Sequence, residues 1–496
     1  MTDMLKYGRP EDTGVKPEWV EAYVAEMNRR RKMCHSFLMM RKGIVIAEGY
    51  WKPFHKDWLH RMYSVSKTFV SAAIGMLVDE GQIKLTDRIA DYFPDKVAEG
   101  DGIHPLVAEM TIEDMLKMAT CHKYSTYTGQ DMDWLHTFFY PHHEPDHPAG
   151  TEFRYDTSAT YTMDVLVERL TGKTFLEYLK DKALRELGFS ENAWCVEAPE
   201  GYAWGGSGVE CTTRDLARFA SIFLNGGEIG GKRYLSEDYV RAATAYQIDN
   251  GKVINPMEGH GYGYQIWRTW KNSFSSCGMG GQLAICIPEK DFLFVCTSDM
   301  QGDPDGYAMI YNVLWDTVID RLADTAEPIP ADDAAYGRLT ALLDSLEVNL
   351  PAGETSSPLA ESIRGVTYSL DDNRMGMRGF TISFDGNGGT LVYHTDRGDK
   401  AFPFGLARYE DTVFPETHYS GRRINQPLGK GYRTLNAAVW TAPEKLLVRT
   451  YAIDDYFGNM AAEFTFDGDD VQLSITKTAE WFFDEYAGKA SGRRAK

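Results

Sequence analysis

Residues 64–81 read SVSKTFVSAAIGMLVDEG and indicate how the first part of the chain is organised. No charged residue occurs between Lys67 and Asp79, and Gly81 follows where a glycine commonly ends a helix. A helix that is apolar on every side lies in the interior of a protein. We therefore predict a central, buried helix with Lys67 in its first turn.

Ser64 and Lys67 have the spacing of two residues on one helical face. A serine hydroxyl is a weak nucleophile and needs a base within hydrogen-bonding reach. Burial disfavours a charged ammonium group and so makes a lysine a better base. We predict that Ser64 is a nucleophile and Lys67 its base; the alternative is a serine near a solvated lysine on an exposed helix.

The composition describes a globular, acidic chain. At about 150 residues per domain, 496 residues are too many for one small domain. A hydrophobic content of 43%, with 24 Phe and 28 Tyr, is sufficient for a large core. The net charge of −20 argues against nucleic acid and anionic membranes as partners.

The N-terminal residues, the length of the apolar runs and the cysteines indicate a cellular compartment. The first residues contain no apolar leader, and no apolar run is long enough to span a membrane. The seven cysteines are odd in number and form no CxxC pair, which favours free thiols in a reducing compartment. We therefore expect a cytoplasmic protein.

The first 325 residues mix strands and helices. Residues 36–40 and 44–47 flank a turn and predict a β-hairpin, and further strands are predicted much later in the chain. These later strands are expected at 262–270, 282–287 and 292–297. The expected helices are 18–31, 161–171, 174–187, 216–224 and 307–322. One antiparallel sheet built from both ends of the domain, with helices between, is an α+β arrangement.

The composition changes near residue 325. A helical pattern at 336–346 and a Pro/Ser-rich linker at 351–358 precede short alternating strands, which predict an all-β domain of sandwich or barrel type. We place a mixed α+β domain that contains Ser64 and Lys67 at 1–327, a helix and linker at 328–362, and a β-rich domain at 363–496. This last domain could cap a cleft, form an oligomer or bind a partner.

Two later segments carry candidate chemistry. Tyr155, in the run Phe153-Arg154-Tyr155-Asp156-Thr157, could pass a proton between a nucleophile and a leaving group. The glycines of residues 276–282, SCGMGGQ, allow a substrate carbonyl to approach backbone amides. The alternatives are an aromatic residue at a helix entrance and a glycine-rich turn that leads into a strand.

The order of these segments resembles the serine β-lactamase-like and penicillin-binding-protein family, in particular its class C-like esterase and amidase branch. The resemblance covers roughly residues 8 to 325. Other stretches that resemble this family are GQIKLTD at 81–87 with YFP at 92–94, TIEDMLKMAT at 111–120, and Ser207-Gly208 through DLARF at 215–219. The resemblance implies a β-lactamase-like domain, with an antiparallel sheet flanked by helices and an all-helical part.

The resemblance also implies residue roles. Ser64 would be the acyl-accepting nucleophile, Lys67 its base and Tyr155 the tyrosine of the second motif. The third motif aligns with residues 276–278, so the amides of Ser64 and of Met279, which follows Gly278, would form the oxyanion hole. No cofactor and no metal is implied.

Two positions depart from the family pattern. Thr157 stands where the second motif has asparagine, and Ser276 stands where the third motif has lysine or histidine. A cation at the latter position anchors the carboxylate of penicillins and D-Ala peptides. We therefore expect poor β-lactamase and carboxypeptidase activity.

We expect a serine hydrolase that acts on a small ester, amide or short peptide through an acyl-enzyme. The alternatives are a D-amino-acid peptidase or weak β-lactamase, and a non-catalytic member of the fold that binds peptides or cell-wall fragments. The histidine-rich residues 140–147 contain two prolines and lack the spacing of a zinc site, so we expect a loop over the active-site mouth. His260, Tyr264 and Trp267 could line the pocket or belong to the core.

Overall fold

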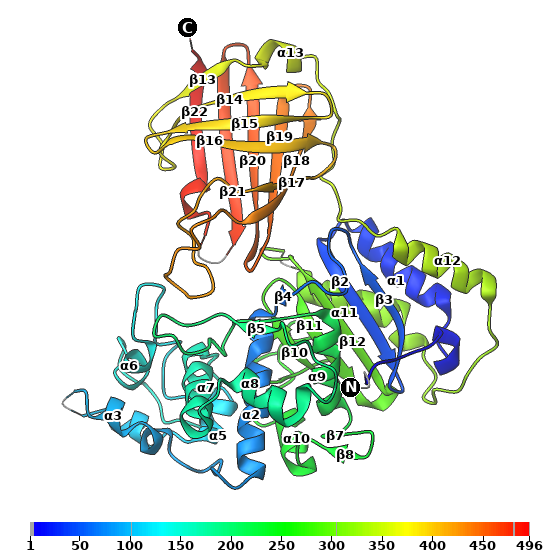
Figure 1. Cartoon of the computed structure of the whole chain (residues 1–496), viewed down its shortest axis with the longest axis vertical. Coiled ribbons are helices and arrows are strands. Elements are labelled where there is room, and N and C mark those ends of the chain that lie inside the picture. Colours follow the sequence, from blue (N-terminus) through cyan, green and yellow to red (C-terminus); the bar gives the residue numbers. More distant parts are fainter. Residues whose placement is uncertain (1–3, 101, 304, 480–481, 496) are drawn as a thin grey trace. The chain divides into compact units, whose positions relative to one another are not determined.

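The structure is a computed structural model that describes residues 4–100, 102–303, 305–479 and 482–495. The chain forms two compact units (Figure 1). The first comprises Met1–Val348 with Arg422–Ile424, and the second comprises Asn349–Gly421 with Asn425–Lys496. The predicted helix and linker at 328–362 therefore contain the division between the units.

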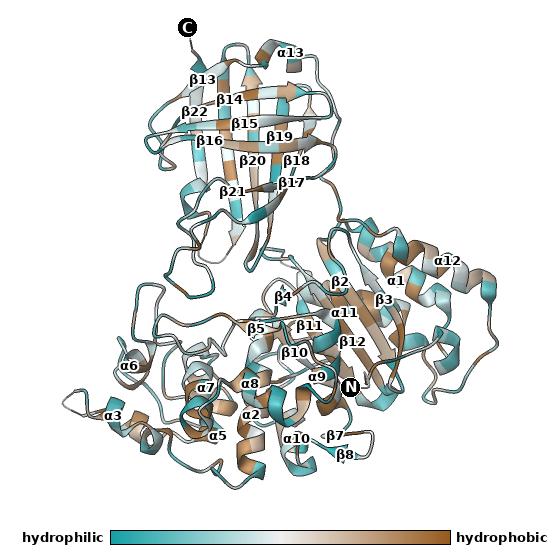
Figure 2. Cartoon of the chain, in the orientation of Figure 1, coloured by the Kyte–Doolittle hydropathy of each residue, from teal (hydrophilic) through white to brown (hydrophobic). Residues whose placement is uncertain are grey.

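A seven-stranded sheet organises the described part of the first unit, with strand order β1-β3-β2-β12-β11-β10-β9. The N-terminal hairpin β2–β3 joins the late strands where β2 pairs antiparallel with β12, so both ends of the unit contribute to one sheet. The strands around β2 and β12 are strongly hydrophobic (Figure 2). The strands are β1 (Lys6–Tyr7), β2 (Cys34–Arg41), β3 (Ile44–Tyr50), β9 (Trp267–Arg268), β10 (Phe274–Gly278), β11 (Gln282–Ile287) and β12 (Phe292–Ser298).

Helices cover both faces of this sheet. Tyr23 of α1 packs against Phe37 and Phe294 on one face. Cys286, whose side chain points to the opposite face, donates a hydrogen bond to the Ala220 carbonyl of α9. The helices near the sheet are α1 (Pro17–Arg29), α9 (Thr213–Leu224), α11 (Gly306–Thr317) and α12 (Asp333–Asp344).

The central helix is α2 (Ser66–Asp79), and every residue from Ser66 to Leu77 is buried. It packs against α7 (Thr157–Thr171), α8 (Phe175–Leu179) and, through Phe69 stacked on Phe219, against α9. The uncharged stretch that follows Lys67 permits this burial on all sides. The prediction of a central, buried helix is confirmed.

The remaining elements of this unit are short. Thr111 and Asp114 form a capping box at the start of α5. The other helices are α3 (Pro94–Val97), α4 (Pro105–Ala108), α5 (Ile112–Leu116), α6 (Trp134–Phe139) and α10 (Glu237–Thr244). The other strands are β4 (His60–Arg61), β5 (Trp194–Cys195), β6 (Val209–Cys211), β7 (Glu228–Ile229) and β8 (Lys232–Arg233).

Some sequence-predicted boundaries are wrong. The strand expected over 262–270 shortens to β9, because Gln265 has a positive φ of 58° that interrupts an extended chain. The helix expected over 174–187 is α8 followed by a π-type segment, Lys180–Leu184. Residues 276–278, which could have been a glycine-rich turn, lie in strand β10, and the turn begins at Met279.

The second unit contains a ten-stranded sheet in its described part, and the parallel pairing of β16 with β18 closes this sheet on itself. Alternate residues of strands such as β20 and β21 are buried, and aromatic side chains including Phe380 and Phe464 fill the interior. Its strands are β13 (Thr367–Leu370), β14 (Met377–Asp385), β15 (Gly388–Thr395), β16 (Gly398–Leu406), β17 (Glu410–Val413), β18 (Arg433–Ala442), β19 (Lys445–Ile453), β20 (Phe457–Asp467), β21 (Asp470–Ala479) and β22 (Gly488–Arg494); helix α13 (Ala360–Ile363) precedes them.

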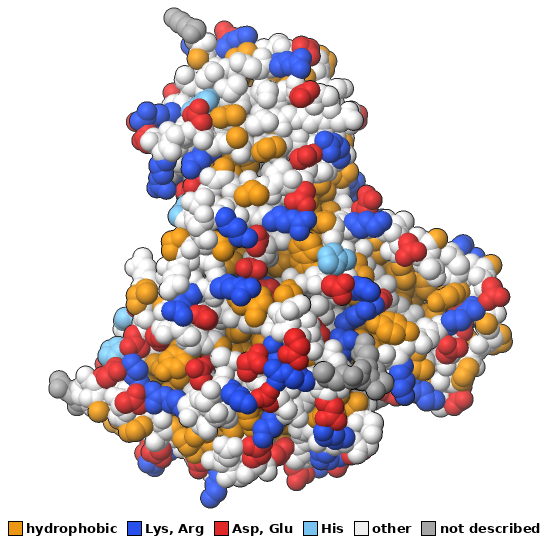
Figure 3. Space-filling model, viewed as in Figure 1, with side chains coloured by type: hydrophobic (Ala, Val, Ile, Leu, Met, Phe, Trp, Pro, Cys, Tyr) orange, Lys and Arg blue, Asp and Glu red, His pale blue; other side chains and the backbone are white. Residues whose placement is uncertain are grey.

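Acidic and basic side chains are interspersed over the face of the molecule seen in Figure 3. Within the described ranges, none of the helices has both the length and the hydrophobicity needed to cross a membrane. All seven cysteines are free, as the sequence predicts.

Candidate active site

Ser64 lies in a 3-10 turn, Tyr63–Val65, that leads directly into α2. It is partly exposed, whereas the other residues from His60 to Leu77 are all buried. Tyr63, just before it, has a φ of 47°, a conformation that a non-glycine residue adopts at some cost. The fold therefore presents one hydroxyl at the surface from an otherwise buried segment.

Lys67 is buried with its amine against Ser64. The distance from Lys67 Nζ to Ser64 Oγ is 3.1 Å, and only 1% of the Lys67 side chain is exposed. Nζ also donates a hydrogen bond to the Gly206 carbonyl at 2.5 Å and lies 5.0 Å from the centroid of the Tyr155 ring. These contacts orient the amine towards the serine hydroxyl.

Tyr155 completes the cluster from the residue that precedes the N-cap of α7. Its side chain hydrogen-bonds to Ser64, and its ring stacks on Trp267 with centroids 5.7 Å apart. Burial raises the pKa of the Tyr155 hydroxyl above its ordinary value, and the bond to Ser64 offsets this only in part. The phenol is thus protonated at neutral pH. The structure brings Ser64, Lys67 and Tyr155 together.

The third motif lies beside the nucleophile turn. A Cβ atom on Gly278 would fall 2.2 Å from the carbonyl oxygen of Met62, two residues before Ser64. The Gly278 carbonyl accepts a hydrogen bond from the Tyr307 hydroxyl at 2.8 Å. Only glycine permits this close approach of the two backbones.

Gln282 holds the turn that contains Met279. Its side-chain amide donates to the carbonyls of Met279 at 2.8 Å and Ser298 at 2.7 Å, while its oxygen accepts from the Ser298 amide at 3.0 Å. Gly280 and Gly281, both with positive φ, complete this turn. The oxyanion role of the Met279 amide stays a prediction.

Three further groups at the site were missed by sequence reasoning or left open by it. The first is the Gly206 carbonyl, which accepts a hydrogen bond from Lys67. The second is Asp164, which accepts a hydrogen bond from the Gly205 amide at 2.6 Å. The third is Trp267, whose ring stacks on that of Tyr155. In the sequence, the adjacent Gly205 and Gly206 were the signal that could have indicated a tight turn. Tyr264, by contrast, is a core residue whose hydroxyl donates to Glu113.

The histidine-rich residues 140–147 show local pairs rather than a metal cage. His142 pairs with Asp131 and His147 pairs with Asp146. Within the part of the chain that the structure describes, no group of three or more His, Cys, Asp or Glu could hold a metal ion.

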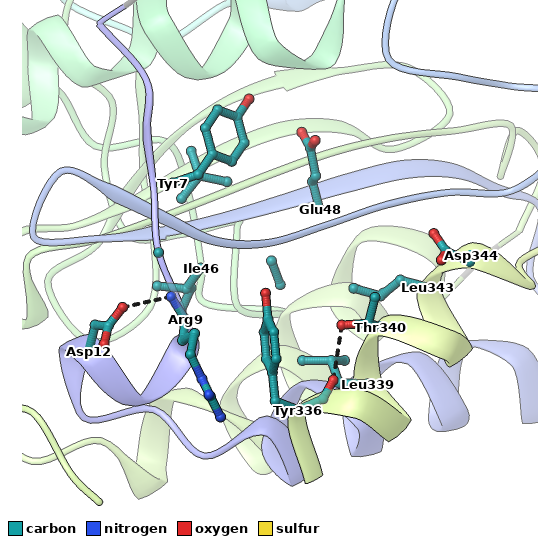
Figure 4. Close-up of a pocket in the computed structure, with 13 residues that line it drawn as sticks. Tyr7, Arg9, Asp12, Ile46, Glu48, Tyr336, Leu339, Thr340, Leu343 and Asp344 are labelled. Atoms are coloured by element: carbon teal, nitrogen blue, oxygen red, sulfur yellow. Dashed lines mark hydrogen bonds between the residues drawn. The ribbon is translucent and has the colours of Figure 1, made fainter. Parts of the chain in front are cut away.

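A pocket of about 440 Å³ lies away from Ser64, between the N-terminal segment, β3 and α12 (Figure 4). Its lining includes Tyr7, Arg9, Glu48 and Tyr336. Arg9 already pairs with Glu11 and Asp333, and its guanidinium lies over the Tyr336 ring. We assign no chemistry to this pocket.

Residues 20–314 match the family model described as Beta-lactamase. The chain belongs to the Beta-lactamase family. This membership confirms the resemblance inferred from the motifs and identifies the protein as a hydrolase of the serine β-lactamase fold.

Individual relatives agree with this family. A 6-aminohexanoate-dimer hydrolase from Paenarthrobacter ureafaciens is 31% identical over 291 residues, which cover 54% of this chain and 73% of the relative. Two solved structures share the fold. A Bacillus anthracis protein proposed to be a 6-aminohexanoate-dimer hydrolase has a TM-score of 0.51 at 20% identity and covers 64% of this chain and 87% of its own. A family VIII carboxylesterase has a TM-score of 0.50 at 18% identity, and the match covers 62% of this chain and 99% of the carboxylesterase chain.

Proposed function

We propose that this family member hydrolyses small esters or amides through an acyl-enzyme formed on Ser64. One observation carries the proposal. Ser64 is the single residue between His60 and Leu77 that is not buried, and both the buried amine of Lys67 and the hydroxyl of Tyr155 contact it. A serine hydroxyl becomes a nucleophile when a base this close can accept its proton.

In the acylation step, Ser64 Oγ attacks the substrate carbonyl and its proton passes to Lys67 Nζ. A tetrahedral intermediate forms, and the amides of Ser64 and Met279 donate hydrogen bonds to its oxyanion. The intermediate then collapses as the bond to the leaving alcohol or amine breaks. Tyr155 relays a proton from Lys67 to that leaving group.

In the deacylation step, a water molecule attacks the acyl carbonyl and gives a proton to the same base. The bond between the acyl carbon and Ser64 Oγ breaks, and the proton returns to Oγ. The products are the carboxylic acid and the free enzyme, so the cycle consumes one water and needs no cofactor.

Two side chains argue against β-lactams as the preferred substrates. Ser276, at the position of the family cation, is buried in β10 and offers no charge to a substrate carboxylate. Thr157, at the position of the family asparagine, turns its methyl group towards Gly206, where a Cβ would lie 2.4 Å away. The P. ureafaciens relative, named as a hydrolase of 6-aminohexanoate dimer, supports a linear amide as one substrate type.

The proposal is tested by intact-mass labelling with a fluorophosphonate and with p-nitrophenyl esters. We expect one adduct per chain on the folded protein and none in Ser64→Ala, since this change removes the attacking oxygen. An unlabelled wild-type protein would exclude the acyl-enzyme.

A substrate panel then tests the preference within this chemistry. Acyl esters and linear amides should turn over at least tenfold faster than nitrocefin, because a group that binds the lactam carboxylate is missing from the third motif. Rapid nitrocefin turnover that disappears in Ser64→Ala would instead favour the β-lactamase alternative.

A further inference from the structure

The Gly205–Gly206 turn, which supplies a hydrogen-bond acceptor to Lys67, is tightly enclosed. A Cβ on Gly205 would fall 2.5 Å from Asp164 Oδ2 and equally close to a methyl group of Val70 on α2. A Cβ on Gly206 would fall 2.4 Å from the methyl group of Thr157. The turn is therefore held between α2 and α7, at positions where a side chain has no room.

Asp164 is the polar contact that fixes this turn to α7. Its side chain is 1% exposed, and its Oδ2 accepts the Gly205 amide hydrogen bond at 2.6 Å. Burial raises the pKa of Asp164 well above its ordinary value, and the charges of Glu168 and Glu200 add to the effect. The interaction that fixes the turn is the hydrogen bond that the buried carboxyl oxygen accepts from the Gly205 amide.

Helix α7 consequently supports two groups that surround the amine of Lys67. Tyr155, directly before the N-cap Asp156, places its ring 5.0 Å from Nζ. Asp164, farther along the same helix, holds the turn whose carbonyl lies 2.5 Å from Nζ. A shift of this turn would therefore move Nζ relative to Ser64 Oγ.

We propose that Asp164 is a positioning residue for acylation, which holds the Gly205–Gly206 turn so that the Gly206 carbonyl directs Lys67 Nζ at Ser64 Oγ. This inference rests on the proposed roles of Ser64 and Lys67. Asp164 itself touches neither substrate nor the reacting atoms. A displacement of a catalytic group by about 1 Å can cost roughly a hundredfold in rate.

The test compares acylation by a p-nitrophenyl ester in Asp164→Asn, Asp164→Ala and Asp164→Leu. Asparagine keeps an acceptor for the Gly205 amide, so its acylation rate at saturating ester should stay within threefold of wild type. Alanine and leucine remove the acceptor, so the rate should fall 10- to 100-fold while KM changes less than threefold. Leucine also keeps the side-chain volume and limits the loss of packing.

Rates are expressed per active site titrated with fluorophosphonate, so that a partly unfolded variant is not counted as slow. Glu168→Ala is the matched control: it removes another carboxyl from α7 that does not bond to the turn, and it should acylate at the wild-type rate. Wild-type rates in both the alanine and the leucine variant would overturn the inference, as would an asparagine variant as slow as they are. Absence of acylation in the wild type would instead remove the proposed function itself.

Discussion

At the scale of single residues, Tyr155 gives the most direct test of proton handling. Tyr155→Phe keeps the ring on Trp267 and removes the hydroxyl that bonds to Ser64. We expect kcat for a linear amide, whose leaving amine must be protonated, to fall about 100-fold, the usual size of a lost proton-transfer group, with little change in melting temperature.

The protonation of Tyr155 also predicts how the rate of the wild-type protein depends on pH. Because burial raises the pKa of Tyr155, its phenol stays protonated as the pH passes the ordinary tyrosine value of about 10. Loss of the Tyr155 proton should therefore not lower the rate up to that pH. A phenylalanine variant with wild-type kcat would show that this hydroxyl takes no part.

At the scale of elements, the approach of β10 to the nucleophile turn is the decisive contact. Gly278→Ala would place a methyl group 2.2 Å from the backbone carbonyl oxygen of Met62, and neither backbone segment can move away without disturbing its neighbours. We expect a loss of about 1–3 kcal/mol in the free energy of unfolding and at least a tenfold slower acylation, measured by chemical denaturation and by burst kinetics.

Gly337 provides the matched control for this substitution. It lies in α12, is exposed, and has no neighbouring atom within 4 Å of an added Cβ. Gly337→Ala should stabilise the protein by roughly 0.5–1 kcal/mol, because alanine loses less conformational freedom in a helix, and should leave acylation unchanged. Equal effects of the two substitutions on the rate would contradict a special role for the β10 contact.

At the scale of the whole molecule, every residue placed in the proposed reaction belongs to the first unit. Leu446→Ala, in the buried interior of β19, should lower the stability of the second unit by about 2–5 kcal/mol because it leaves a cavity. The acylation rate per titrated site should equal that of the wild type at temperatures where calorimetry shows both proteins folded. A matching loss of rate would mean that the second unit contributes to the site.

Short-range patterns in the sequence were sufficient to predict several parts of this protein. The uncharged stretch after Lys67 predicted the buried helix α2, and the three-residue spacing predicted that Ser64 and Lys67 face each other. The order of the motifs identified the family. In the second unit, alternating residues predicted strands because side chains in a strand point to opposite faces in turn.

The distant groups that surround Ser64 and Lys67 come together through tertiary packing and could not be predicted from local patterns. The Gly206 carbonyl reaches Lys67 across 139 residues, and Asp164 reaches Gly205 across 41. Whether residues 276–278 form a turn or a strand depended likewise on their pairing with β11. These contacts arise when α7 packs beside α2 and β10 packs beside the turn that carries Ser64. Local propensity does not indicate which distant segments will meet. The nucleophile and its base could therefore be predicted from one helix, whereas the groups that aim them depend on packing.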